Sequence, residues 1–522
     1  MLKIGLTPAR TLMWIVPVLV VMIVSMVFTS WWFVPTGVFV LLWIAPTMLE
    51  VNGASLYETM RRGRETDKPY EPVSLREVDG TAVLLEDGVV SVWLEVMPRE
   101  TVDVTVVAGD GVVSRPFIDL SKLSPLMRQS DVVIDSVVVN SMAYDTYLPG
   151  YAAGNAIAQS MGKVAAPTGG RTWINVRARV EDNLAAAEAR STGEFDVGMI
   201  RAVLSAVARL RVVIEEGGHH VVLLSPDMVR QVSSMVQAGT GRIFDKAGKG
   251  YFGDADSTSR AYALYPRRHV TREQTVLWRD LPSTRMFTTT TLTPAGGTGD
   301  DTARVTDRVV LVTRDGSAKD KAAQAGLSVL NRQQRQAATW LVPAVVSQPV
   351  AQPSYAMERL HPVLHYGGGM GTYLGATKTG GGVFVRVRPG SGKTLHLIGD
   401  DVMHRVMVMR MLMESHSVNV LVDDDTEQQW AALGRRLRTP LFAVGSDEKA
   451  DFVVTTPQVH AAVKQADPDQ CIVVVSATTP NMALENSVHV KGTTAVVTTE
   501  TDQKTAIFSP TPVSYTHLTL PT

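Results

Sequence analysis

The residues with the most obvious chemical potential form the phrase PGSGKT at 389–394. A phosphate-binding loop has the pattern G-x-x-x-x-G-K-[ST] and opens a helix, whose backbone amides cradle the phosphates. Here Val387 occupies the position of the first glycine, and Lys393 leads into the alternating run 395–398, which predicts a strand. We therefore interpret PGSGK as a β-hairpin turn. A membrane-anchored P-loop ATPase is the weaker alternative.

A second candidate is the acidic run Asp423-Asp424-Asp425, which follows the predicted strand VNVLV. Three carboxylates at this point could hold a divalent metal, as in a membrane-tethered nucleotide-sugar glycosyltransferase. Aspartates between a strand and a helix also cap the helix, and Thr426 and Glu427 continue into a helical pattern. The sequence favours the cap, and the glycosyltransferase stays an alternative.

The other polar motifs do not form a site. The glycine clusters 367–371 and 380–382 lack a G-x-G-x-x-G pattern between a strand and a helix. The histidine pairs 219–220 and 361/365 have no partners at ligand spacing, so we predict surface or loop histidines. Cys471, in the apolar run CIVVV, is expected to be a buried structural thiol. We predict no catalytic, cofactor-binding or metal-ligating residues, no cofactor and no enzymatic activity.

The first soluble segment, 75–342, is predicted to be an α/β domain. Asp87-Gly88 between two alternating runs predicts a β-hairpin. Other elements expected from periodicity are a strand at 172–180, a helix at 195–216, a strand at 219–224, a helix opening at 225–227, a loop-rich part at 239–303 with one or two strands, and a helix at 320–341.

The second soluble segment, 363–511, alternates strands with helices of 10–14 residues, which predicts parallel strand pairs. The expected helices are 401–414, 426–437 and 457–466, between strands at 383–388, 394–398, 418–422, 441–444 and 471–475. Methionines in 403–413 are predicted to fill the core. The fold class is mixed α/β (α+β), in two subdomains.

The N-terminal part, 1–51, is predicted to be a transmembrane hairpin. No residue from Thr11 to Leu49 is charged. A single helix of this length would measure about 58 Å, nearly twice the hydrocarbon core of a bilayer. We therefore expect two helices, at about 11–28 and 33–49, with a turn near Thr29-Ser30. Residues 52–74 read as a polar linker.

Charges around the hairpin set its orientation. Lys3 and Arg10 precede the first helix, and Arg61, Arg62, Arg64 and Lys68 follow the second. The positive-inside rule then puts both termini and the bulk of the chain in the cytoplasm, on the plasma (inner) membrane. In the whole chain of 522 residues, 50 Lys and Arg balance 51 Asp and Glu, so no nucleic-acid partner is expected.

Several phrases, taken in order, resemble the EccE family of type VII (ESX) secretion systems in mycobacteria and their actinobacterial relatives. They are the N-terminal hairpin, WLEVMPRE (93–100), RTWINVR (171–177), Tyr262 to Tyr265 with Trp278, GLSVLNRQQRQAA (326–338), GTYLGATKTGGGVFVRV (371–387), LIGDD (397–401) and VNVLVDDDTEQQW (418–430). The last residues, 512–522, resemble a translated sequencing adapter, and we treat them as a non-native tail.

The resemblance implies a non-catalytic structural subunit of an inner-membrane secretion complex. Its implied partners are EccB, EccC with its FtsK-like ATPase, and EccD, together with the lipid bilayer and the mycosin protease. The family has no catalytic residues to transfer to this sequence. The implied role is to support assembly of a larger oligomeric complex and protein export.

Overall fold

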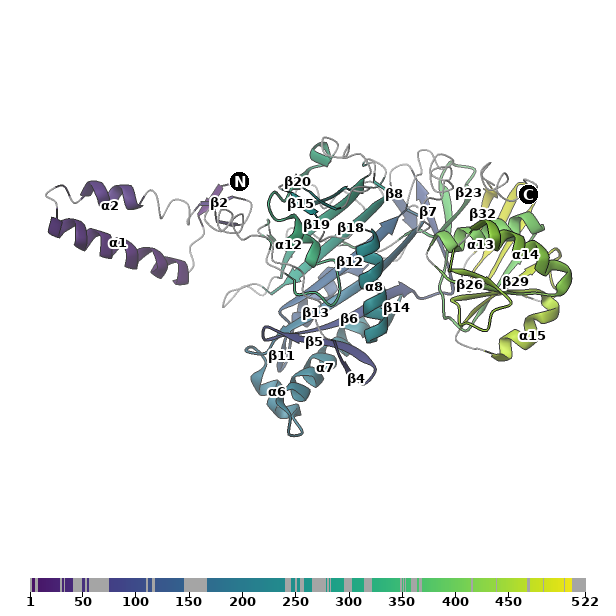
Figure 1. The fold of residues 1–522 in the computed structure, drawn as a ribbon, viewed down its shortest axis with the longest axis horizontal. Coiled ribbons are helices and arrows are strands. Elements are labelled where there is room, and N and C mark those ends of the chain that lie inside the picture. The colour runs from purple at the N-terminus through teal and green to yellow at the C-terminus, as the bar shows by residue number, and fades with distance from the viewer. Residues whose placement is uncertain are drawn as a thin grey trace.

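The structure is a computed structural model with two large β-sheets (Figure 1). With short gaps, it describes residues 2–4, 8–40, 49–55, 75–144, 167–264, 278–294, 303–313, 322–357, 364–365 and 369–508. The undescribed residues include most of the predicted linker and all of the tail at 512–522, so these two predictions lie outside the described residues.

The first sheet has 13 strands, and all of its pairs are antiparallel. In sheet order they are β15 (Lys246–Gly248), β16 (Tyr251–Gly253), β17 (Thr258–Leu264), β19 (Arg304–Thr313), β18 (Arg285–Thr293), β12 (Ser136–Tyr144), β13 (Gly169–Arg179), β6 (Val89–Pro98), β5 (Thr81–Glu86) and β4 (Arg76–Val78); β14 (His219–Leu223), β20 (Leu327–Val329) and β21 (Tyr355–Ala356) pair with β6, β17 and β19.

Several local predictions for this sheet are confirmed. Strands β5 and β6 form the hairpin, with Asp87 and Gly88 both at positive φ, as a type I′ turn requires. Helix α7 (Phe195–Glu216) buries its apolar stripe against one face of the sheet and ends at two glycines, of which Gly218 has φ +87°. Helices α6 (Leu184–Arg190) and α8 (Pro226–Gly239) flank it in sequence.

The helix predicted at 320–341 is wrong. Within the described residues, this segment contains strand β20, which pairs with β17, and then the short helix α12 (Gln334–Thr339). Gly326, at φ +85°, precedes the strand, and Leu327 pairs with Leu264. Tertiary pairing with the edge of β17 therefore overrides the local helical periodicity.

The second sheet has 12 strands and a parallel core. In sheet order they are β27 (Phe442–Val444), β26 (Val418–Leu421), β28 (Phe452–Thr455), β29 (Cys471–Ser476), β25 (Thr394–Ile398), β30 (Ser487–Lys491), β31 (Thr494–Thr498), β32 (Gln503–Phe508), β23 (Thr372–Ala376), β24 (Gly382–Val387), β7 (Val102–Ala108) and β8 (Gly111–Ser114). The first six are joined by parallel pairs, as predicted.

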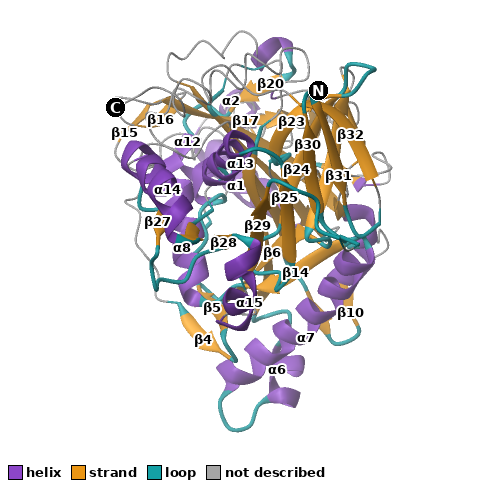
Figure 2. Ribbon diagram, turned by 90° about the vertical axis from the view of Figure 1, so that its right-hand side faces the viewer, coloured by secondary structure: helices purple, strands orange, loops and turns teal. Residues whose placement is uncertain are grey.

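Helices α13 (Asp401–Met413) and α14 (Asp424–Leu437) contribute to the main core of the second sheet, whereas α15 (Pro457–Ala466) packs with residues of its other face (Figure 2). Met403, Met407 and Met411 are buried in this core, which confirms the prediction for the methionines. Cys471 is buried as well, and burial raises the pKa of its thiol to about 12.

The mixed α/β class is confirmed, but one connection was not foreseen. Strands β7 and β8 come from the first predicted domain in sequence, yet β7 pairs with β24 of the second sheet. Shorter elements complete the body: β9 (Ile118–Asp119) pairs with β22 (Leu364–His365), β10 (Arg128–Gln129) pairs with β11 (Val132–Val133), and 3-10 helices span Leu120–Lys122 and Ser124–Met127.

Near the N-terminus, α1 (Pro8–Phe28) and α2 (Phe33–Phe39) lie side by side (Figure 1). Strand β1 (Leu2–Ile4) pairs antiparallel with β2 (Leu49–Val51), and β2 pairs with β3 (Ala54–Ser55). The described part of the predicted second helix thus ends near residue 40. Among the described residues, no helix meets the combined requirements of length and apolarity for crossing a membrane.

Candidate functional site

Strand β13 organises the polar chemistry of the first sheet. It lies between β12 and β6, and its alternate residues Ile174, Val176 and Ala178 pack in the core that contains α7. Because side chains alternate along a strand, Arg171, Trp173, Asn175, Arg177 and Arg179 share the opposite face. This face packs with α8 and α12 through Trp173. One strand therefore carries three arginines along a largely covered face.

Arg171, at the first end of β13, forms an ion pair with Glu95 of β6. Nε and Nη2 donate to the two carboxylate oxygens, each at 2.6 Å. The side chains are 19% and 7% exposed. Burial alone would lower the pKa of Arg171, but the Glu95 carboxylate raises it, and the net shift is upward. This bidentate pair is the strong, oriented type of charge interaction.

Ionisable groups of the second sheet lie near the Arg171–Glu95 pair. We call this region, where the two sheets meet, the junction. Glu414, just after α13, accepts a hydrogen bond from Thr372 Oγ1, and burial raises the pKa of its carboxyl to about 8. His416 lies with Nε2 3.9 Å from a Glu414 oxygen, and burial lowers the pKa of its imidazole to about 4. From the first sheet, the Tyr144 hydroxyl donates to the Glu414 carbonyl at 2.8 Å.

Backbone hydrogen bonds also join the two sheets at the junction. Met370 N donates to Pro167 O at 2.8 Å, and Gly371 N donates to Thr168 O at 2.7 Å. A Cβ on Gly369 would lie 2.3 Å from the carbonyl carbon of Gly169. Gly369, from the glycine cluster at 367–371, therefore allows the start of β13 and the second sheet to approach closely.

The PGSGK turn joins β24 to β25, and Gly390 and Gly392 both have positive φ. The strand predicted after Lys393 is confirmed, but the hairpin is wrong, because β25 pairs in parallel with β29 and β30 rather than with β24. Lys393 Nζ contacts Glu500 Oε1 at 2.6 Å. The lysine is thus part of a surface ion pair.

Asp423 occupies the N-cap position of α14, as predicted, and its side chain accepts from hydroxyl groups. Its Oδ1 accepts from Thr426 Oγ1 at 2.7 Å, and its carbonyl accepts from Glu427 N at 3.0 Å. Asp424 and Asp425 are exposed in the first turn, where carboxylates favour the helix dipole. Among the residues that the structure describes, no group of three or more His, Cys, Asp or Glu side chains is placed to hold a metal ion.

The histidine prediction is wrong for one pair. His219 and His220 belong to strand β14, and His219 is only 8% exposed. Burial lowers the pKa of His220. The preceding Gly217-Gly218 turn directs the chain straight into pairing with β6, so no loop separates it from the sheet. His365 lies in the short strand β22, and His361 lies outside the described residues.

Comparison with known families identifies the segment that contains β13. Residues 166–247 match a family described as "Putative type VII ESX secretion system translocon, EccE". This segment is similar to the EccE family, in agreement with the resemblance seen along the sequence. The EccE match covers β13, α6, α7, β14 and α8, and so includes all three arginines of the strand. No curated protein matches the chain.

Sequence reasoning missed the groups that meet at the junction between the two sheets. Glu95 and Arg171 both stand in phrases that carry the family resemblance, but 76 residues separate them. Their facing positions depend on the pairing of β6 with β13, which no local pattern specifies. Gln334, from the NRQQRQ phrase, was missed too. Its side-chain oxygen accepts a hydrogen bond from Ala261 N at 2.7 Å, and its side-chain nitrogen donates to Ala261 O at 3.0 Å. These two bonds join α12 to β17.

Proposed function

We propose that this chain is a non-catalytic structural subunit of the type VII secretion inner-membrane complex, supporting its assembly and protein export. The family match over residues 166–247 carries the proposal. The polar groups that could suggest catalysis have structural partners: Lys393 pairs with Glu500, and Asp423 caps α14. These contacts favour a role in assembly.

The proposal includes membrane anchoring by residues 1–51. Large apolar side chains on α1 and α2 are exposed, among them Ile23 at 58% and Val27 at 73%. Pairing of β1 with β2 returns the chain to the side from which α1 starts. Together with the basic flanks, this supports a multi-pass anchor with both termini and the main body in the cytoplasm.

The partners follow from the same similarity to the family. We propose EccB, EccC, with its FtsK-like ATPase, and EccD as neighbours in the membrane complex, with the mycosin protease as a further contact. The large cytoplasmic body would supply most of the contact area, because stable protein interfaces need roughly 1,000 Å² or more. The hairpin would contribute recruitment to the bilayer.

The test is complementation of a strain that lacks this chain. Export of secretion substrates and recovery of the intact membrane complex by affinity purification are measured together. The full-length protein should restore both, and Lys393→Ala and Asp425→Asn should restore them equally well. Export that persists without the chain would refute the subunit role. Loss of export with a normally assembled Lys393→Ala complex would instead indicate a chemical step.

A matched experiment examines the anchor. Deletion of residues 1–51 should reduce membrane recruitment, and an unrelated two-helix anchor should restore complex assembly and most of the export. If the replacement anchor reaches the membrane but leaves the complex unassembled, the native hairpin makes specific contacts and this division of roles is wrong.

A further inference from the structure

A cavity of about 790 Å³ opens at the second end of β13. Arg177 and Arg179 of this strand line it, together with Arg128, Asp135, Asp182 and Trp340. The cavity lies at the far end of the strand from the Arg171–Glu95 pair, and no residue of that junction lines it. It is therefore separate from the contacts described above.

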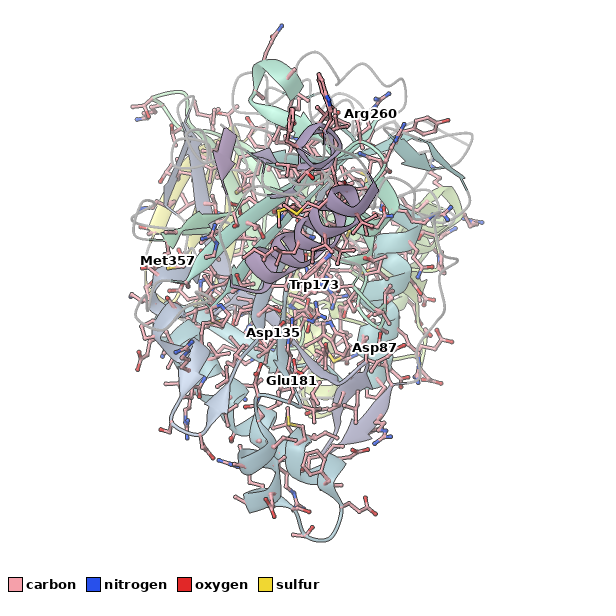
Figure 3. The ribbon with its side chains drawn as sticks, turned by 90° about the vertical axis from the view of Figure 1, so that its left-hand side faces the viewer. Asp87, Asp135, Trp173, Glu181, Arg260 and Met357 are labelled. Carbon is pink, nitrogen blue, oxygen red and sulfur yellow. The ribbon has the colours of Figure 1, made fainter. Side chains whose placement is uncertain are left out.

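Of the arginines that line the cavity, one forms ion pairs with carboxylates and two do not. Arg179 is neutralised by Asp135 at 2.6 Å and also contacts Glu181 at 3.4 Å; Figure 3 labels these two acids, which lie close together. Arg128 and Arg177 form no ion pair with any described residue. The cavity wall thus presents two cations without an ion-pair partner among the described residues, and Asp135 acts on Arg177 only at longer range.

A further cation lies behind the wall. The guanidinium carbons of Arg177 and Arg308 lie 5.1 and 4.5 Å from the centre of the Trp340 ring. Arg308 is only 4% exposed, and among the described residues its Nε and Nη1 have no hydrogen-bond partner. Burial lowers its pKa to about 9, so it still carries a proton at neutral pH.

The acid next to Arg308 in sequence forms no ion pair with it among the described residues, although its charge raises the pKa of Arg308 against the effect of burial. Asp307 and Arg308 are consecutive in β19, so their side chains point to opposite faces of the sheet. Asp307 instead accepts a hydrogen bond from Thr290 Oγ1 at 2.6 Å. Burying a cation without a hydrogen-bonded counterion is unfavourable. An anion bound beside Trp340 would relieve this cost.

We propose that this cavity binds an acidic segment of a partner protein, whose carboxylates meet Arg177 and Arg128 beside Trp340. The inference rests on the proposed function, since it assumes that the chain works through contacts with other subunits. Arginine matches carboxylate geometry in a bidentate way and stacks on aromatic rings. Arginine and tryptophan are also the residue types that dominate binding energy at protein interfaces.

Binding is tested with the full-length chain in detergent. The probe is a fluorescein-labelled peptide of alternating glutamate and glycine, and the control peptide has glutamine in place of glutamate. Only the acidic peptide should bind. Arg177→Gln should weaken binding at least about tenfold, as expected for loss of a charged hydrogen bond. Arg230→Gln, which removes one exposed arginine on α8, should leave binding unchanged.

Two further variants distinguish a loss of peptide binding from misfolding. Arg128 is exposed, so the Arg128→Gln variant should fold normally and still bind the acidic peptide more weakly. Arg177→Lys keeps the charge but loses the fork of donors, and should bind with intermediate affinity. Absence of binding, equal loss in Arg230→Gln, or tighter binding of inorganic phosphate or ATP at the same arginines would overturn the proposal.

Complementation separates this inference from the proposed function. Arg128→Gln/Arg177→Gln should lower recovery of the membrane complex and reduce export. If the double variant supports full export while deletion of the chain abolishes it, the subunit role holds and the cavity proposal fails. If deletion has no effect on export, the proposed function fails whatever the peptide binds.

Discussion

The parallel part of the second sheet and the centre of the first sheet differ in how far apart in sequence their strands lie. In the second sheet, β28, α15 and β29 form a compact unit, and β26, α14 and β27 form another. In the first sheet, β12 pairs with β18 and β6 with β14, each across more than a hundred residues. Local pattern therefore specifies much of the parallel part of the second sheet, whereas the centre of the first sheet and the β7–β24 pairing of the second depend on contacts between residues distant in sequence.

The sheets also differ in how their buried charges are matched. In the first sheet, Glu95 matches Arg171 in full, whereas Arg308 keeps two donors without a partner. In the second, Arg410 is buried and stays charged, with its pKa lowered to about 10, whereas buried Glu414 and partly buried His416 are kept neutral near pH 7. The first sheet thus has a buried charge next to a cavity, and Glu414 and His416 make the stability of the second sheet sensitive to pH.

The largest effect should come from the first sheet's ion pair. Glu95→Leu leaves Arg171 buried without its carboxylate, and we expect a loss of about 3–5 kcal/mol in the free energy of unfolding. Denaturant unfolding of the full-length protein measures it. Glu95→Leu/Arg171→Met should recover most of this loss, because apolar replacement of a buried pair is near neutral. A double variant as unstable as the single one would contradict the assignment.

A smaller loss should follow from a methyl group between the sheets. Gly369→Ala places Cβ against the backbone of Gly169, which cannot move without shifting β13. We expect about 2–3 kcal/mol of destabilisation. Gly380→Ala is the control, since no atom lies within 4 Å of its Cβ and only its φ of +87° opposes the change. Equal losses would mean that the close approach is not limiting.

Predictions from sequence succeeded where local patterns mark an element and failed where strands pair across long distances in the sequence. The helix α15 and the strand β25 were predicted to the residue, because proline, glycine and alternation mark their ends locally. Position in the sheet was not predictable: PGSGK was expected to form a hairpin, but β25 inserts between β29 and β30. The junction and the Arg308 cavity were missed because their residues meet only through long-range pairing.

The pH dependence of stability should arise in the second sheet. The folded pKa of Glu414, about 8, exceeds its ordinary 4.5, so the folded state holds an extra proton in this range and stability falls as pH rises through it. His416, lowered from 6.5 to about 4, acts in the opposite sense below pH 6.5. Between pH 6.5 and 8, Glu414 should lower stability by about 1.5 kcal/mol, and the remaining titration of His416 in the unfolded state should offset only a small part of this.

Unfolding measured at pH 6.5 and 8 checks this window. Glu414→Gln keeps the shape and accepts from Thr372 but cannot ionise, so its stability should change much less over the range. Glu500→Gln is the surface control and should retain the wild-type slope, since the pKa of Glu500 is lowered by Lys393 and lies well below this window. A wild-type slope that survives in Glu414→Gln would assign the effect to another group.

The smallest effect should come from the acidic run of the second sheet, and it separates capping from metal binding. Asp423→Ala removes the side chain that accepts from Thr426, and loss of an N-cap destabilises by about 1 kcal/mol. Asp423→Ser, another good cap, should recover most of this, and Asp425→Asn should change stability by less than about 0.5 kcal/mol. A metal site predicts a different order, because serine is a poor substitute for a carboxylate ligand and Asp425 would matter as much as Asp423. Adding Mg²⁺ or Mn²⁺ to the wild type should leave its unfolding midpoint unchanged, since only a ligand that prefers the folded state raises it. A midpoint that rises with metal concentration in the wild type but not in Asp425→Asn would overturn the cap and return this edge of the sheet to the chemistry of nucleotide-sugar enzymes.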